Sequence, residues 1–118
     1  MQLIEQTFVV RRLEALLTAS ESGFRSAFQH FQDALTLAFR KEEEDMVLIG
    51  YATRDAHMAE HQKLLQLLWR ISARMHYDGA AAGADMVDML PHCLLEHMIK
   101  VDLPLQQALG SQISYSPR

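Results

Sequence analysis

The segment SGFRSAFQHFQDALTLAFRKEEEDMVLIG, residues 22–50, has one helical pattern from end to end. Gly50 can end this helix, because glycine readily adopts the left-handed conformation that follows a last helical turn. Apolar side chains recur at helical spacing along the segment and predict a long amphipathic helix with one buried face: Phe24, Phe28, Phe31, Leu35, Ala38, Phe39, Met46 and Ile49.

Three more segments have helical spacing, at residues 3–18, 54–77 and 86–102. Thr53 stands where a threonine can cap the helix that follows it. The stretch DGAAAGAD at 78–85 is typical of a loop, since two glycines and two aspartates interrupt the apolar pattern.

Two prolines restrict the fourth helix. If Asp88 caps it, Pro91 falls in the first turn, where a missing N–H does no harm; if Asp85 is the cap, Pro91 must kink the helix. Pro104 disfavours helical geometry at the residue before it, so this helix is expected to end near Asp102.

The chain contains only five glycines and three prolines in 118 residues, which leaves few places to turn and favours long elements. No stretch alternates as a strand would. We therefore expect an all-α fold, an up-down-up-down four-helix bundle over residues 1–110, followed by a polar C-terminal tail at 111–118.

Composition excludes several classes of protein. A hydrophobic content of 49% is too high for a disordered chain, and one cysteine cannot form an internal disulfide. The net charge of −4 argues against a nucleic-acid partner. No apolar run approaches the ~18 residues of a membrane span, and the early Glu5 does not fit a secretory signal, so we expect a cytoplasmic protein. No nucleophile–base pair, phosphate loop or cofactor motif indicates an enzyme.

Two of the six histidines stand one helical turn apart, since His57 and His61 are at positions i and i+4 and share a face. Two imidazoles in that arrangement can bind one metal ion. The sequence between them, H-M-A-E-H, does not match the zinc-protease pattern H-E-x-x-H. Three of the other four, His30, His76 and His92, are expected on the surface.

The fourth helix adds His97 and Asp102, which are five residues apart. Five residues turn an ideal helix by ~140°, so the two side chains would point to different sides. Both can reach one centre if Asp102 lies at a frayed helix end, and Pro104 favours such an end.

The second helix contributes an acidic run at 42–45, close to its C-terminal end. Carboxylates there oppose the helix dipole, which favours cations at this end. A bound cation facing Glu42 or Glu43 would explain them; the alternative is a solvated acidic turn.

These pieces together resemble the hemerythrin family, including the bacterial hemerythrins. FRKEEEDMVLIGY at 39–51 fits F-x-x-E-E-x-x-M-x-x-x-x-Y, and it is followed by H-x-x-x-H at 57–61 and H-x-x-x-x-D at 97–102. The ordered combination over three helices is far more specific than any one piece.

The resemblance implies a four-helix bundle with two non-haem irons that bind O2 between them. It assigns three histidine ligands of one iron to His57, His61 and His97. It assigns the two carboxylates that bridge the irons to Glu42 and Asp102.

The second iron of the family lacks its histidines here. One maps to Ala38, and residues 1–29 contain no histidine for the other. Glu5, Glu14 or a water could replace an imidazole, but nothing favours one of them. A tryptophan of the family is replaced by Cys93, which is either a small core residue or an oxidant-responsive thiol near the site.

We therefore expect one non-haem iron in a degenerate site that binds or senses O2, NO or redox state. Zinc or manganese would suit the same donors, whereas copper(I) would want sulfur. The signal would pass through a homodimer or a signalling partner. The alternative is a metal-free bundle, with the histidines and carboxylates as plain ion pairs, that acts as an interaction or dimerisation module.

Overall fold

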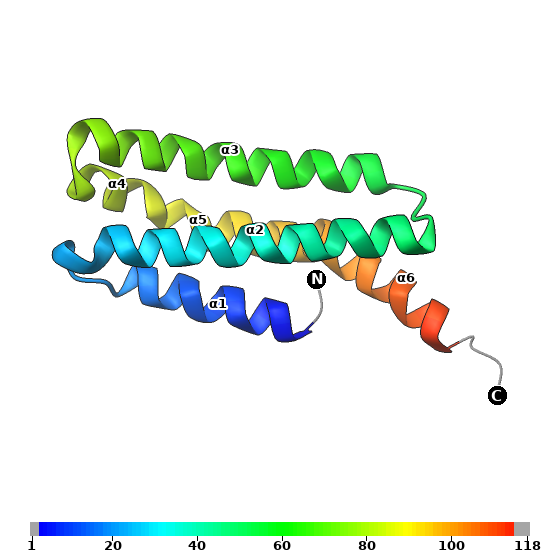
Figure 1. Cartoon of the computed structure of the whole chain (residues 1–118). Helices are drawn as coiled ribbons and strands as arrows, with labels where there is room; N and C mark the ends of the chain where they lie inside the picture. Colours follow the sequence, from blue (N-terminus) through cyan, green and yellow to red (C-terminus); the bar gives the residue numbers. More distant parts are fainter. Residues whose placement is uncertain (1–2, 115–118) are drawn as a thin grey trace.

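Four helical rods, each antiparallel to the one before it, form a bundle (Figure 1). The computed structural model describes residues 3–114. The first three rods are α1 (Leu3–Leu17), α2 (Phe24–Ile49) and α3 (Arg54–Asp78). The fourth rod is made of consecutive pieces: α4 (Ala80–Met86), a 3₁₀ turn (Val87–Met89), α5 (Leu90–His97), a π-turn (Met98–Asp102) and α6 (Leu103–Ser114). The described residues include no strand, and the predicted all-α four-helix bundle is confirmed.

Local capping explains where α2 begins and ends. The Ser20 hydroxyl accepts a hydrogen bond from the Gly23 backbone N–H at 3.3 Å, in the 3₁₀ turn Glu21–Gly23 that precedes the helix. Gly50 ends α2 in the left-handed conformation, with φ of 62°, as its sequence position predicts. Thr53 occupies the N-cap position of α3, as predicted, but its side chain makes no capping hydrogen bond.

The stretch at 78–85 is mostly helical, which corrects the prediction of a loop there. Gly79 makes the reversal alone, with φ of 91°, and α4 starts at the next residue. Alanines at the start of α4 favour the helix. Gly83 is buried against α3, and a Cβ at this position would collide with the Met75 side chain. The glycines here serve one turn and one close contact.

The start of α5 shows whether Asp85 or Asp88 caps this helix. Pro91 lies in the first turn, so it does not kink the helix. Neither aspartate caps it through a side chain: Asp85 lies within α4, Asp88 lies in the 3₁₀ turn, and Met89 occupies the capping position.

The fourth rod does not end at Asp102, contrary to the sequence-based expectation. The Leu103 N–H bonds to the Met98 carbonyl across a π-turn, and α6 continues to Ser114. A π-turn interrupts the regular hydrogen-bond ladder and thus accommodates Pro104, whose ring would clash within a straight helix. Figure 1 shows α6 leaving the line of the rod from this point. The helix also reaches into the expected tail, while residues 115–118 lie outside the described residues.

The core of the bundle is apolar over most of its length and polar in one place. Phenylalanines of α2, leucines of α1 and α3, and Val87, Leu90 and Leu94 of the fourth rod form the buried apolar cluster. No helix among the described residues has the length and apolarity needed to cross a membrane. Six polar or charged residues are also buried, and all but one form the cluster described next: Glu42, Asp45, His57, His61, His97 and Asp102.

Candidate metal centre

Three rods bring five possible metal ligands to one point in the interior. α2 contributes Glu42, α3 contributes His57 and His61, and the fourth rod contributes His97 and Asp102. Each offers one donor atom, and these five atoms all lie within 4.8 Å of one another. All five side chains are buried, with exposed fractions of 0–5%. The five residues that the sequence analysis singled out therefore meet in space.

The acidic side chains of the run at 42–45 in α2 point in different directions. Glu42 is fully buried, and one of its oxygens, Oε1, lies 3.1 Å from His57 Nε2 and 2.7 Å from His61 Nε2. Glu43 is half-buried and reaches His61 from the other side, and Glu44 is exposed. The run is therefore not a solvated turn, because its first two members contact the histidine cluster.

His61 stands between two carboxylates. Its Nδ1 lies 2.8 Å from Glu43 Oε2, and its Nε2 lies 2.7 Å from Glu42 Oε1. A neutral imidazole has only one N–H. We assign that proton to Nδ1, which donates to Glu43; Nε2 and Glu42 Oε1 then face each other as two acceptors. Such a pair needs a cation between or beside them, either a second proton or a metal ion.

A π-turn aligns the two donors of the fourth rod. His97 Nε2 lies 3.1 Å from Asp102 Oδ1, and His57 Nε2 lies 3.5 Å from the same oxygen. In a π-turn the i→i+5 hydrogen bond places residues five apart one above the other. Asp102 therefore does not reach the centre from a frayed end, as the spacing had suggested, but from within a continuous helix.

Several atoms of the cluster have no hydrogen-bond partner among the described residues. They are His57 Nδ1, His97 Nε2 and both carboxylate oxygens of Asp102; the 3.1 Å contact between His97 Nε2 and Asp102 Oδ1 lacks the geometry of a hydrogen bond. Buried polar atoms without partners are costly, and native structures contain few of them. Imidazole nitrogen and carboxylate oxygen are also the donors that iron, manganese and zinc accept. The unpaired atoms and the donor types both fit a metal ion.

Charge within the cluster shifts two pKa values. Burial by itself would raise the pKa of Glu42, but hydrogen bonds from His57 and His61 hold it far below its usual range. Burial would lower the pKa of His57, but the carboxylates of Asp102 and Glu42 raise it to about 9. Among the protein groups alone, a proton on His57 therefore takes the place that a metal ion would fill.

Ala38, the position to which the resemblance assigns a histidine of the second iron, lies in the apolar core. Ala38 is 1% exposed and belongs to the apolar core together with Val9 and Leu13 of α1. Glu14 is exposed, and the side chain of Glu5 lies outside the described residues. Among the described residues, the five-membered cluster is the one group of histidines, cysteines and carboxylates with metal-binding geometry.

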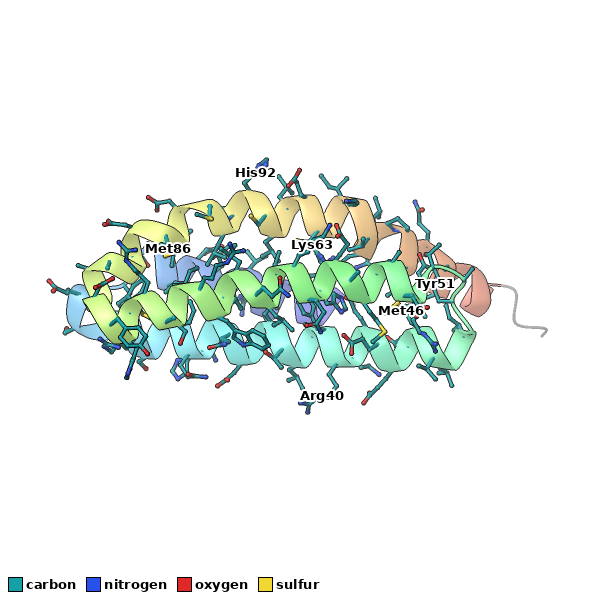
Figure 2. The ribbon with its side chains drawn as sticks, turned by 90° about the horizontal axis from the view of Figure 1, so that it is seen from above. Arg40, Met46, Tyr51, Lys63, Met86 and His92 are labelled. Carbon is teal, nitrogen blue, oxygen red and sulfur yellow. The ribbon has the colours of Figure 1, made fainter. Side chains whose placement is uncertain are left out.

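Aromatic rings enclose the cluster. Phe39 stacks on His61 with ring centroids 3.8 Å apart and planes 8° from parallel, and it also touches the ring of His97 at 5.1 Å. Tyr51, in the connection between α2 and α3 (Figure 2), lies edge-on to His57 at 6.5 Å. The stacking limits the rotation of the His61 ring and covers one of its faces.

The remaining candidates lie away from the centre. His30, His76 and His92 are exposed as predicted, and Figure 2 shows His92 on the outer edge of the fourth rod. Cys93 is half-buried at the core margin and shares a cavity wall with His97. Glu43 is a functional candidate that the sequence left as an alternative to Glu42, whereas the structure shows that both contact His61.

The sequence analysis missed the ion pairs that Glu60 makes with two lysines. Glu60 Oε2 lies 2.7 Å from Lys63 Nζ, and its Oε1 lies 2.9 Å from Lys100 Nζ in the π-turn. These two hydrogen bonds lower the pKa of Glu60 to about 2. Its position directly before His61 was the available signal, but no rule from one sequence pairs it with Lys100.

Comparison with known proteins gives one relative. No family profile matches the chain, and no solved structure matches it. A bacteriohemerythrin of Methylococcus capsulatus is 33% identical over 85 residues, which are 72% of this chain and 65% of that protein. The chain thus spans slightly less than two thirds of its relative. This match, the four-helix bundle and the buried cluster of histidines and carboxylates together show that the chain is hemerythrin-like.

Proposed function

We propose that this protein binds one non-haem iron ion through His57, His61, His97, Glu42 and Asp102, and that it binds or senses O2, NO or redox state there. The observation that supports this most is His61, whose two nitrogens both face carboxylates at 2.7 and 2.8 Å in a fully buried position. The unpaired Nε2 of His97 and oxygens of Asp102 add to it. The relative's name, bacteriohemerythrin, supports iron in particular.

One ion is favoured over two because only one half of a dinuclear site has donors. Ala38 and the buried residues of α1 provide methyl and aliphatic groups where the second ion would need nitrogen or oxygen. Zinc or manganese would accept the same donors, and a thiolate-preferring ion would not. A bound iron would supply an electron-transferring centre with room for a small diatomic ligand.

The residues around the cluster have separate tasks in this proposal. Glu43 accepts the Nδ1 proton of His61 and so leaves Nε2 free to coordinate, as carboxylates beside metal-bound histidines commonly do. Phe39 holds the ring of His61 in one plane and keeps water away from it. We infer a binding or sensing protein of the cytoplasm and not an enzyme, with a second copy or a signalling partner to receive the signal.

Metal content tests the proposal directly. Protein purified without oxygen and loaded with Fe(II) should retain about one iron per chain. The double variant His57→Ala/His61→Ala should retain almost none. The control His76→Ala/His92→Ala removes two exposed histidines and should bind like the wild type. Two irons per chain would refute the single-ion site, and equal iron in both double variants would refute these ligands.

The metal-free alternative has one observation in its favour. The raised pKa of His57 means that a proton on this residue offsets part of the negative charge of Glu42 and Asp102. A bundle of this kind would serve as an interaction module, for which Val47 and Leu48, 63% and 83% exposed at the end of α2, offer apolar surface. An unchanged melting temperature in chelator, together with no bound metal, would support this alternative.

A further inference from the structure

An ion pair connects the two helices that carry the histidine ligands. Glu60 lies on α3 between His57 and His61, and Lys100 lies in the middle of the π-turn between His97 and Asp102. Glu60 Oε1 and Lys100 Nζ are 2.9 Å apart. The other carboxylate oxygen is 2.7 Å from Lys63 Nζ, within the same helix. One carboxylate therefore makes a contact between the two helices and a second contact within α3.

This pair also lies between two cavities that reach the cluster from different sides. Glu60 and Lys100 are in the walls of both. The first, about 430 Å³, reaches His57; the second, about 410 Å³, reaches His97. The Glu60 carboxylate is mostly covered, with 17% of its side chain exposed, while Lys100 reaches it from the solvent side.

The π-turn needs an outside contact to keep its position. Hydrogen bonds in this geometry are less regular than those of an α-helix, and Ile99 and Lys100 are both exposed. From inside, Asp102 Oδ1 lies 3.5 Å from His57 Nε2 on α3, without the geometry of a hydrogen bond. Outside the ligand cluster, Glu60–Lys100 is the ion pair among the described residues that ties the turn to α3.

We infer that Glu60 and Lys100 are positioning residues that hold the π-turn against α3 and thereby slow the release of the bound ion. The inference rests on the proposed metal site. If the pair breaks, the turn can move away from α3, and Asp102 and His97 move with it. Water and competing ligands then reach the ion from either cavity.

The rate of metal release tests this role. Metal-loaded protein is mixed with an excess of a strong chelator, and release is followed in Glu60→Gln, Lys100→Met, Lys100→Arg and Lys63→Met. Breaking an exposed ion pair changes an opening equilibrium by at most about fivefold. We expect release about three- to fivefold faster in Glu60→Gln and Lys100→Met, and unchanged release in Lys63→Met and Lys100→Arg.

The two breaking variants separate contact from simple electrostatics. Glu60→Gln removes a negative charge near the ion, and Lys100→Met removes a positive one. If these charges act only by attracting or repelling the ion, the two variants should change the release rate in opposite directions. If the contact between the two residues matters, release should be faster in both variants. Release from the wild type should also accelerate with salt, because salt screens exposed charges, and release from Lys100→Met should not.

The results distinguish this inference from the proposed function. Retained metal with equal release rates in all variants, or opposite effects in Glu60→Gln and Lys100→Met, would overturn the positioning role and leave the site standing. No metal in the wild type would overturn the proposed function itself. Melting temperatures of the variants should stay close to the wild type, which shows that the fold is intact.

Discussion

His97 and Asp102 meet because a π-turn separates them. Their side chains approach to 3.1 Å between Nε2 and Oδ1, although five residues would turn an ideal helix by ~140°. π-turns within helices occur frequently at functional sites. Here the turn lets one helix present a nitrogen and a carboxylate to the same point.

Removal of the Asp102 charge should affect metal binding and stability in different ways. Asp102→Asn keeps the shape but replaces one coordinating oxygen by an amide group. Asp102 is one of the carboxylates that raise the pKa of His57, so the metal-free variant should be less stable than the metal-free wild type at pH 6, and the difference should shrink by pH 10. Its metal affinity should fall by at least about tenfold, since a ligand matters more than its outer neighbours. Chelator competition and urea unfolding at the two pH values measure the two effects; equal stability of the metal-free variant and the metal-free wild type at pH 6 would show that Asp102 does not stabilise protonated His57.

Loss of Glu43 should weaken metal binding without removing a ligand. Glu43→Ala deletes the acceptor of the His61 Nδ1 proton, 2.8 Å away. The ring can then rotate or protonate at Nε2, and metal affinity should fall about 10- to 100-fold. Glu44→Ala is the matched control, because Glu44 carries the same charge and is exposed. Equal affinities in the two variants would mean that charge alone, and not the contact with His61, is responsible.

A histidine at Ala38 should not create a second metal site. Ala38 is 1% exposed, so the larger side chain must displace core residues, at a cost of about 1–3 kcal/mol in unfolding free energy. α1 still offers apolar side chains opposite it, and the metal content of Ala38→His should stay near one per chain. Ala56→His, at an exposed position, controls for adventitious binding by an added imidazole. Two metals per chain in Ala38→His alone would show that the second half of the site is nearly complete.

Stability of the chelated protein should depend on pH through His57 and Glu42. The pKa of His57 is raised from 6.5 to about 9, so its contribution is complete below about pH 6.5 and disappears as the pH rises through 9. The pKa of Glu42 is lowered, so its contribution is present above about pH 4.5 and disappears at lower pH. The metal-free protein should therefore be most stable in mildly acidic solution.

Urea unfolding in chelator at pH 6 and pH 10 measures this dependence. We expect a loss of about 2 kcal/mol on going to pH 10. His57→Gln should remove most of that loss, whereas His92→Gln, at an exposed position, should retain it. A pH profile that is identical in the wild type and His57→Gln would contradict this assignment.

The fold of this protein could be predicted from local patterns, except where a glycine or a proline was taken to interrupt a helix. α1, α2 and α3 lie within a few residues of their predicted bounds, because a long apolar stripe has only one helical arrangement that buries it. α4 was missed because glycine usually indicates a turn, yet Gly83 is needed for close contact with Met75. The end of the fourth rod was misplaced because Pro104 ends an α-helix but is tolerated after a π-turn.

The candidate ligands could also be named from sequence, through their residue types and their resemblance to the hemerythrins. Residue spacing determines how side chains are arranged around one helix, as for His57 and His61. It does not determine how far that helix is rotated or shifted against another. For this reason, residue spacing could not choose between Glu42 and Glu43, a choice that only the resemblance made, and it could not pair Glu60 with Lys100.

The sequence by itself thus determined the helices, their buried faces and the chemical types of donor that they carry. Only the tertiary structure decided that Glu42 faces inward, that Glu43 reaches the far nitrogen of His61, and that a π-turn aligns Asp102 with His97. The physical reason is that these relations depend on packing between helices. The energy of that packing is shared among many side chains and is not encoded in any one of them.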